Sequence, residues 1–332
     1  MANVTVQSEK EVSWLRQAWA RIRKIHPVFP VFLIVFLAVG YLNPKFIEPN
    51  GILIFLRRAA PLGILAVGQL FVLAAGGFDL SVGSQVTFVV IGGALLINND
   101  PEKLTYTLLV LYGIGILVGL INGLVVTFMK VPSFIATLGM LLALKGAGLY
   151  WTGGAPRGYL TDNFRQFGRG FLEPVPVVER FPIAVVVLIV VVAIAAYIFH
   201  FTIFGRQILA VGDNPVAAKL SGINVRRVRI LTFIVSALCA ITAGILEGGF
   251  GGVNIIAGDG LELQAISAAV LGGAVLLGGR GAVLAAAAGA LTLEALFNFL
   301  NLIGQPEGVR DVVQGLIIIG AVAYAAINAR RR

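Results

Sequence analysis

The stretch that decides the fold is residues 59–98, AAPLGILAVGQLFVLAAGGFDLSVGSQVTFVVIGGALLIN. Two apolar runs, 59–76 and 82–98, flank a short break that contains Asp79, the only charged residue of the stretch. A membrane span needs roughly 20 mostly apolar residues, and each run approaches that length. The pattern therefore predicts two membrane helices joined by a glycine-containing break.

The remaining sequence repeats this apolar character. Of the 332 residues, 58% are hydrophobic, 12% are charged, and the mean hydropathy is +0.94. An average soluble domain carries about 25% charged residues, so this composition excludes a conventional soluble enzyme. We predict an all-α polytopic membrane protein with about ten transmembrane helices. The other apolar segments lie near residues 28–43, 104–129, 133–152, 182–200, 229–248, 263–279, 282–303 and 309–328.

The distribution of basic residues predicts the orientation of the chain. Ten spans place both termini on one side, and most Lys and Arg residues lie in the connections on that side. Because basic residues concentrate in cytoplasmic connections, both termini are expected inside the cell. The mixed-charge segment 153–182 then lies outside, and the basic segment 201–229 lies in the cytoplasm. The net charge of +9 is spread over these connections, which argues against a nucleic-acid partner.

This topology divides the chain into three regions. Residues 28–328 form the transmembrane domain, between an N-terminal segment, 1–27, and a basic cytoplasmic tail, 329–332. Residues 12–25 place apolar side chains at helical spacing, which predicts an amphipathic helix on the cytoplasmic membrane surface. A basic tail that only sets the topology is the alternative.

The two halves of the chain show a weak internal symmetry. Residues 76–84 interrupt the hydrophobicity in the first half, and residues 271–273 and 278–281 interrupt it in the second. Glycine-containing breaks at corresponding positions indicate a transport pathway between two pseudo-repeated halves. Close helix packing through small residues explains the same glycines equally well.

The sequence contains no recognisable catalytic arrangement. It has no G-x-x-x-x-G-K-[ST] phosphate loop and no His-Glu-x-x-His helix. Its two histidines, His26 and His200, lie at segment edges, so we expect no metal site and no cofactor bound by this chain. A solute transporter of this kind needs either its own ion-coupling site or a separate ATPase.

Ion coupling would require acidic groups inside the membrane, which are costly and usually functional. Glu294 lies centrally in its predicted span, and Asp79 lies in the glycine break. An ion-coupled secondary transporter is therefore a hypothesis. A polar patch that structures the helix bundle is the alternative.

Coupling to a separate ATPase would require a cytoplasmic segment that contacts the ATPase, and residues 204–223 have the pattern of such a segment. Asn214 is a favourable N-cap, Pro215 suits the first helical position, and Gly222 suits a helix end. The pattern predicts a short helix on the inner face. It either transmits force from an ATPase or simply covers the bundle.

Here the sequence resembles a known family. Val216, Ala217, Ala218 and Gly222 are similar to the E-A-A-x-x-x-G coupling loop of bacterial ABC importer permeases, with valine in the acidic position. Residues 77–84 resemble the G-G-I-D-L-S-V-G-S signature of ribose-type monosaccharide permeases, with Phe78 replacing isoleucine. The resemblance covers about residues 28–328, and further matches lie at 122–123, 131–139, 220–224 and 278–281.

The resemblance implies a monosaccharide permease of the bacterial inner membrane, with nucleosides or branched-chain amino acids as alternative cargo. Such permeases pair as homo- or heterodimers and receive sugar from a periplasmic or lipid-anchored binding protein. A partner ATPase uses the ATP and magnesium. The implied ATPase-coupling residues are Asn214, Pro215, Val216, Ala217, Ala218, Lys219 and Gly222. The implied structural signature comprises Gly77, Asp79, Ser81, Gly83, Ser84, Gly279 and Gly281.

Two assignments within this picture remain open between function and structure. We interpret Asp79 and Ser81 as satisfying backbone N–H groups at the start of the following helix, with direct sugar contact as the alternative. A sugar path should offer sparse polar groups beside aromatic rings, and the same polar groups also tie membrane helices together. The candidates are Asn122, Ser133, Phe134, Thr137, Gln264, Ser267, Phe297, Asn298 and Asn301.

Lys145, inside a predicted span, is expected to extend outward to the interface rather than to pair with a carboxylate.

Overall fold

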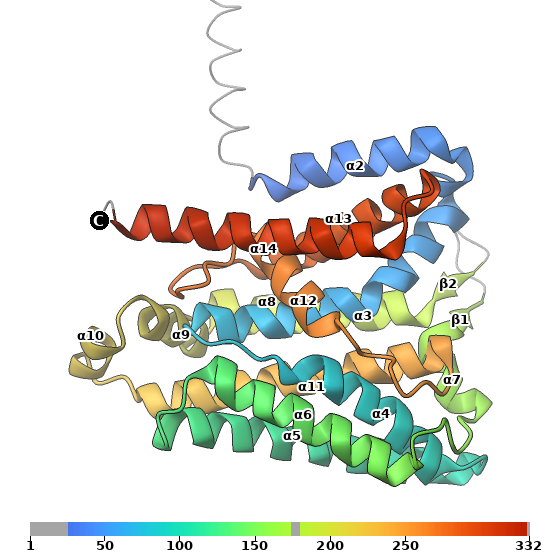
Figure 1. The fold of residues 1–332 in the computed structure, drawn as a ribbon, viewed down its shortest axis with the longest axis horizontal. Coiled ribbons are helices and arrows are strands. Elements are labelled where there is room, and N and C mark those ends of the chain that lie inside the picture. Colours follow the sequence, from blue (N-terminus) through green and yellow to red (C-terminus); the bar gives the residue numbers. More distant parts are fainter. Residues whose placement is uncertain (1–25, 174–179, 331–332) are drawn as a thin grey trace, which may run out of the picture.

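The computed structural model describes residues 26–173 and 180–330. This part of the chain is mostly helical, which confirms the predicted class (Figure 1). The two short strands, β1 (Phe171–Leu172) and β2 (Phe181–Pro182), pair antiparallel beside the N-terminus of a long helix. The predicted amphipathic helix at 12–25 lies outside the described residues.

The helices follow the apolar segments of the sequence closely. Two 3-10 turns, η1 (Pro44–Phe46) and η2 (Pro101–Lys103), separate consecutive helices. The α-helices are α2 (Val28–Leu42), α3 (Pro49–Ala74), α4 (Ser81–Ile97), α5 (Leu104–Phe128), α6 (Ser133–Thr152), α7 (Asp162–Arg169), α8 (Ile183–Phe201), α9 (Ile203–Asp213), α10 (Pro215–Leu220), α11 (Val225–Gly251), α12 (Leu261–Leu271), α13 (Val283–Leu302) and α14 (Glu307–Arg330).

Six stretches of the described chain are long and apolar enough to cross a membrane: α3, α5 with its preceding turn, α6, α8, α11 and α13. The helices α2, α4 and α12 are apolar but shorter. The expected segment 263–279 is only partly helical, since α12 ends at Leu271. The reason is backbone conformation: Gly273, Gly278 and Gly279 all have φ near +80 to +90° (78, 91 and 78°), a region that side chains disfavour.

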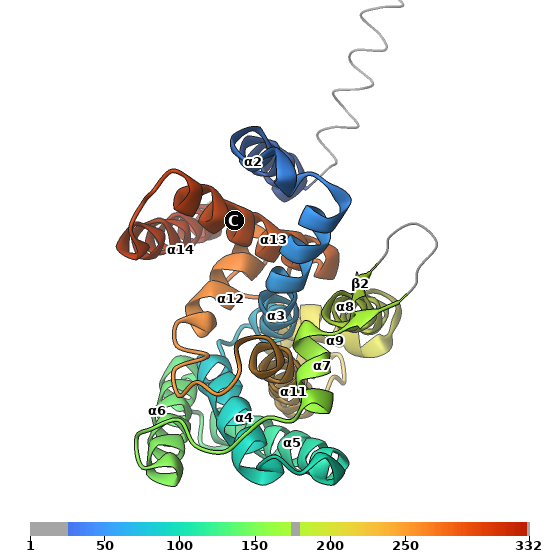
Figure 2. The same ribbon diagram turned by 90° about the vertical axis from the view of Figure 1, so that its right-hand side faces the viewer.

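The centre of the bundle is formed by α3 and α11. In Figure 2, α2, α13 and α14 lie on one side of this pair, and α4, α5 and α6 lie on the other. Every residue of α3 from Ala59 to Ala74 is buried, as expected for a helix that is apolar on all faces and enclosed by others. The arrangement buries the end of α3 together with Asp79 and Leu80 of the break, whereas Gly76 at the start of the break is exposed.

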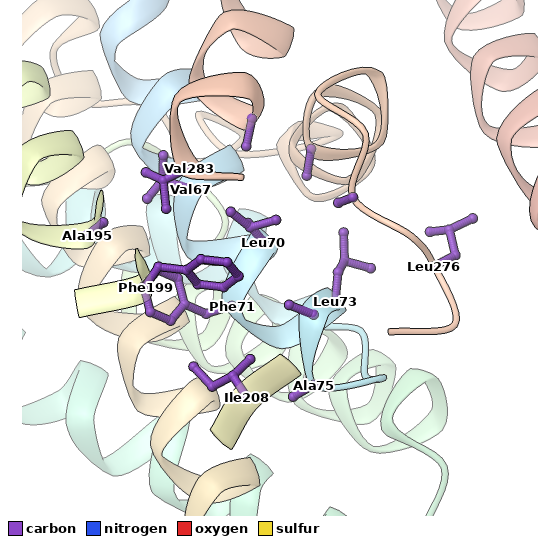
Figure 3. Packing of buried hydrophobic residues seen from close by; sticks show 14 of the residues in the cluster. Val67, Leu70, Phe71, Leu73, Ala75, Ala195, Phe199, Ile208, Leu276 and Val283 are labelled. Atoms are coloured by element: carbon purple, nitrogen blue, oxygen red, sulfur yellow. The ribbon is translucent and has the colours of Figure 1, made fainter. Parts of the chain in front are cut away.

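A hydrophobic cluster at the end of α3 joins segments from both halves of the chain (Figure 3). Phe71 of α3 meets Phe199 of α8 edge to face, with ring centroids 5.3 Å apart. Ile208 of α9 and Val283 at the start of α13 complete the contact, and both are fully buried. The helix that leads into the predicted coupling segment is therefore packed directly on the core.

Candidate functional site

The break between α3 and α4 is organised by the buried carboxylate of Asp79. Its Oδ1 accepts hydrogen bonds from the backbone N–H of Ser81 at 3.0 Å and from the Ser81 hydroxyl at 2.6 Å. Its Oδ2 accepts from the hydroxyl of Ser236 on α11 at 2.9 Å. Because Ser81 is the first residue of α4, the carboxylate both satisfies a free N–H of that helix and ties it to α11.

Three side chains from two other helices, α5 and α6, complete the break. Asn122 of α5 donates its amide to Ser81 Oγ at 3.0 Å. Ser133 and Thr137 of α6 accept the backbone N–H groups of Phe78 and Leu80, each at 3.0 Å. These bonds satisfy backbone groups that a membrane interior would otherwise leave unpaired. Asn122, Ser133 and Thr137, three of the predicted path residues, thus tie helices together at the break.

A small cavity of about 190 Å³ lies next to this break, between α4, α6 and residues 255–262. Its polar lining comes from α4, α6 and the segment before and at the start of α12, and one aromatic ring, that of Phe88, lies among the apolar groups. The polar residues are Ser84, Thr87, Lys145, Asp259 and Glu262. Such a mixture suits a ligand with hydroxyl groups and an apolar face.

An ion pair bridges two walls of this cavity. Lys145 Nζ of α6 lies 2.8 Å from Asp259 Oδ2, and both side chains are more than one-third exposed. The expectation that Lys145 extends outward is therefore wrong, because Asp259, distant in the sequence, is brought within reach by the fold. On the neighbouring wall, Thr87 Oγ1 accepts the backbone N–H of Gly258 at 2.9 Å.

The signature glycine Gly83 allows α4 to pack closely against the segment 258–262, which forms the neighbouring wall of the cavity. A Cβ atom at Gly83 would lie 2.6 Å from the carbonyl oxygen of Gly258 and would also overlap the Glu262 carboxylate. No side chain fits in that space without displacing backbone. The absence of a side chain at Gly83 therefore sets the distance between α4 and the segment 258–262.

The other predicted path residues are dispersed. Ser267 is buried and donates its hydroxyl within α12 to the Leu263 carbonyl at 2.8 Å, and Phe297 is packed in a hydrophobic cluster with α3 and α12. The side chains of Gln264 and Asn298 are half-buried, whereas Phe134 and Asn301 are exposed. The structure therefore does not gather the nine candidates around one cavity.

The predicted coupling helix forms as α10. Asn214 Oδ1 accepts the backbone N–H groups of Val216 and Ala217, each at 3.0 Å, and Gly222 takes a left-handed φ of +83° after the helix ends. Figure 1 shows α10 projecting beyond the ends of its neighbours. The side chains of Val216 and Leu220 are 68% and 86% exposed, whereas Ala218 is buried. The tip of α10 therefore presents two aliphatic side chains outward.

Both glycine breaks meet the end of α9, directly before α10. The backbone N–H of Gly279 donates to the carbonyl of Ala74 at 3.0 Å. A Cβ atom at Gly278 would lie 2.8 Å from the carbonyl oxygen of Gly212 and 3.0 Å from the Cα of Gly76. We call these residues, 76, 212, 278 and 279, the glycine junction. It places the segment that carries α10 against a break from each half of the chain.

The remaining acidic candidate, Glu294, does not join these features. It is half-buried on α13, near Arg58 of α3 and Arg310 of α14. Within residues 26–173 and 180–330, no three His, Cys, Asp or Glu side chains are grouped to hold a metal ion.

Residues 51–322 match the family of branched-chain amino acid transport system permease components. The chain belongs to this family. It is 37% identical to the ribose import permease protein RbsC of Bacillus subtilis over 91% of this chain and 92% of that protein. Identity to RbsC of Escherichia coli K12 is 34%, covering 96% and 98% of the two chains. The autoinducer 2 import system permease protein LsrC of Enterobacter sp. is 35% identical, covering 89% and 84%.

No solved structure matches the chain significantly. The family membership confirms the resemblance read from residues 77–84 and 214–222, and it makes this multi-pass membrane protein a transport subunit rather than an enzyme. Permeases of ABC importers work with an ATPase and a substrate-binding protein, so the family also implies those two kinds of partner.

Several residues of the cavity were missed from the sequence. Lys145 was expected to extend outward rather than to pair with a carboxylate, and Thr87, Phe88 and Asp259 were not singled out. One signal was present: a lysine in the middle of an apolar segment requires a partner or an aqueous space. Its partner, 114 residues later in the chain, could not be chosen without the helix packing.

Proposed function

We propose that this permease carries a monosaccharide of about the size of ribose across the bacterial cytoplasmic membrane. The observation that carries the proposal is the similarity to ribose import permeases over nearly the whole of both chains. The cavity beside the Asp79 break supports it chemically. Hydroxyl, ammonium and carboxylate groups lie beside the ring of Phe88. This arrangement suits a sugar better than a branched-chain amino acid, whose side chain is fully apolar.

The size of the cavity indicates which part of the path it represents. Pockets that enclose small ligands usually measure roughly 300–1,000 Å³, whereas this one holds about 190 Å³. Lys145 and Asp259 neutralise each other across it. The cavity therefore corresponds to a narrow section of the path. This section must widen before a sugar can pass and exchange its hydroxyl groups for the internal polar contacts.

The membrane arrangement proposed here has ten helices in two halves, with both termini in the cytoplasm. The six long helices are joined by α2, α4, α12 and α14, and the break regions shorten α4 and α12 inside the bundle. In this orientation α10 faces the cytoplasm, and the segment 153–182 faces outward toward a binding protein. A second permease copy or paralogue completes the membrane unit.

The helix α10 contacts a separate ATPase, which binds the ATP and magnesium, and transmits the conformational change of that ATPase to the permease. Residues 214–219 and Gly222 form the contact, with the exposed Val216 and Leu220 at its tip. Because the glycine junction joins the end of α9 to both breaks, movement of α10 reaches α4 and α13 together. ATP hydrolysis thereby changes the widths of the inner and outer openings.

The test is uptake into proteoliposomes that contain this permease, its ATPase and its binding protein. Labelled ribose, xylose, galactose, autoinducer 2, a nucleoside and leucine are compared with and without internal ATP. Accumulation of one sugar, dependent on ATP and abolished without the ATPase, is the expected result. Uptake by the permease alone in a proton or sodium gradient would identify an ion-coupled transporter instead. ATP-dependent uptake of only the nucleoside or leucine would overturn the assignment of cargo.

A further inference from the structure

The N-terminus of α11 carries three arginines within its first five residues. Arg226, Arg227 and Arg229 lie in the first turns of this 27-residue helix, whose first turn has no acidic residue. Among residues 26–173 and 180–330, no carboxylate forms an ion pair with any of the three. The N-terminus of a helix is itself the positive end of its dipole, so the three arginines add to a positive potential. An anion bound here would relieve that repulsion.

A shallow, open hollow lies beside these arginines, between the end of α5 and the start of α11. Arg226, Arg227 and Asn224 line one part of it, and Phe128, Ile230 and Leu231 provide apolar walls. The Arg226 guanidinium lies 5.3 Å from the centroid of the Phe128 ring. This cation–π contact fixes the guanidinium at the boundary between the polar and apolar walls.

The hollow adjoins a surface suited to lipid. Phe128 and Met129, at the end of α5, are 55% and 71% exposed, and the exposed Lys130 follows them directly. Apolar side chains followed by a basic residue are typical of a membrane–water boundary. In the orientation proposed above, this boundary belongs to the cytoplasmic leaflet, where anionic lipids attract basic residues close to the membrane.

We propose that this hollow binds the phosphate of an anionic phospholipid. The planar guanidinium groups of Arg226 and Arg227 hold the phosphate oxygens, for which their geometry is suited. The upper part of an acyl chain lies against Phe128 and Leu231. A free phosphate would satisfy the arginines but leave the apolar walls uncovered, so the shape and the charge together favour a lipid. The inference does not depend on which solute the permease carries.

The experiment compares lipid binding by the full-length chain and two charge-matched variants. The test variant is Arg226→Gln/Arg227→Gln, and the control is Arg206→Gln/Arg280→Gln, which removes two exposed arginines outside the hollow. Each protein is delipidated and titrated with phosphatidylglycerol, phosphatidylcholine or inorganic phosphate. Native mass spectrometry measures the bound lipid. Each basic residue near an anionic surface contributes about fivefold to affinity, so the test variant should lose about 25-fold for phosphatidylglycerol.

The outcomes separate the possible ligands. We expect the unmodified chain and the control to prefer phosphatidylglycerol to phosphatidylcholine, and Arg226→Lys/Arg227→Lys to retain that preference. Phosphatidylglycerol binding that survives in a folded Arg226→Gln/Arg227→Gln variant would overturn the proposal. Equal binding of both lipids, or displacement of the lipid by inorganic phosphate at the same concentration, would also overturn it. Loss of ATPase association without loss of lipid binding would reassign these arginines to a protein contact.

Discussion

Replacement of Asp79 by alanine should destabilise the permease strongly, because three buried donors lose their acceptor together. The Ser81 N–H, the Ser81 hydroxyl and the Ser236 hydroxyl all donate to this carboxylate, which is fully buried. Leaving one buried donor unsatisfied costs about 1–3 kcal/mol. Partial rearrangement of Gln85 and Asn122 around Ser81 places the total near the lower end, at about 3–6 kcal/mol.

Asp79→Asn is the matched control for this prediction. Its side-chain oxygen still accepts from both donors of Ser81, and the Ser236 hydroxyl can rotate to accept from the new amide. The expected loss is therefore about 1–2 kcal/mol, limited to the weaker, uncharged hydrogen bonds. The asparagine variant should retain the break and its attachment to α11.

Thermal unfolding of the purified chain in detergent measures both effects. For a large chain, each kcal/mol of lost stability lowers the midpoint temperature of unfolding by about 2 °C. The midpoint should therefore fall by about 6–12 °C in the alanine variant and by about 2–4 °C in the asparagine variant. Equal stability of the alanine variant and the unmodified chain would refute the role of Asp79 in holding the break. An asparagine variant that is stable but inactive in ATP-driven uptake would show that the carboxyl group itself acts in transport.

Three further predictions concern the cavity and the coupling helix. Gly83→Val should displace the segment around Gly258 and cost about 1–3 kcal/mol by overpacking, whereas a glycine with open space around it, such as Gly139, should tolerate alanine; unfolding midpoints compare the two. Lys145→Met should change the free energy of unfolding by less than about 1 kcal/mol, because its ion pair is partly exposed, and it should lower sugar uptake. The double variant Lys145→Asp/Asp259→Lys, which restores the pair with its charges exchanged, should recover uptake. Leu220→Asp should leave stability within about 0.5 kcal/mol and abolish co-purification of the ATPase, and an unchanged ATPase yield would exclude this tip as the contact.

The glycine junction gives the proposed coupling a defined mechanical basis. Interhelical transmission requires elements that are packed closely enough to move together. At the junction, Gly212 lies against the backbone of Ala74 and Gly279, with no side chain between them. The end of α9 therefore contacts the backbone of both breaks directly, which supports the proposed transmission of movement from α10.

The amino-acid sequence by itself determined the local features of this protein. Runs of apolar residues define helices because every backbone group must be bonded internally within a membrane. The helices follow the predicted runs except at 272–279, where glycines with positive φ follow the early end of α12. Asn214 and Pro215 define the start of α10 because capping depends on neighbouring residues only. The motif around Asp79 likewise identified the family.

Only the tertiary structure decided which distant groups meet. Ser133 and Thr137 bond to a break more than fifty residues earlier, and Lys145 pairs with Asp259 across 114 residues. Polar residues in membrane helices look alike in a sequence whether they line a path or tie helices together. Their roles depend on the relative rotation and depth of packed helices, which hydropathy does not encode. For that reason the sequence located the glycine break but not the cavity beside it.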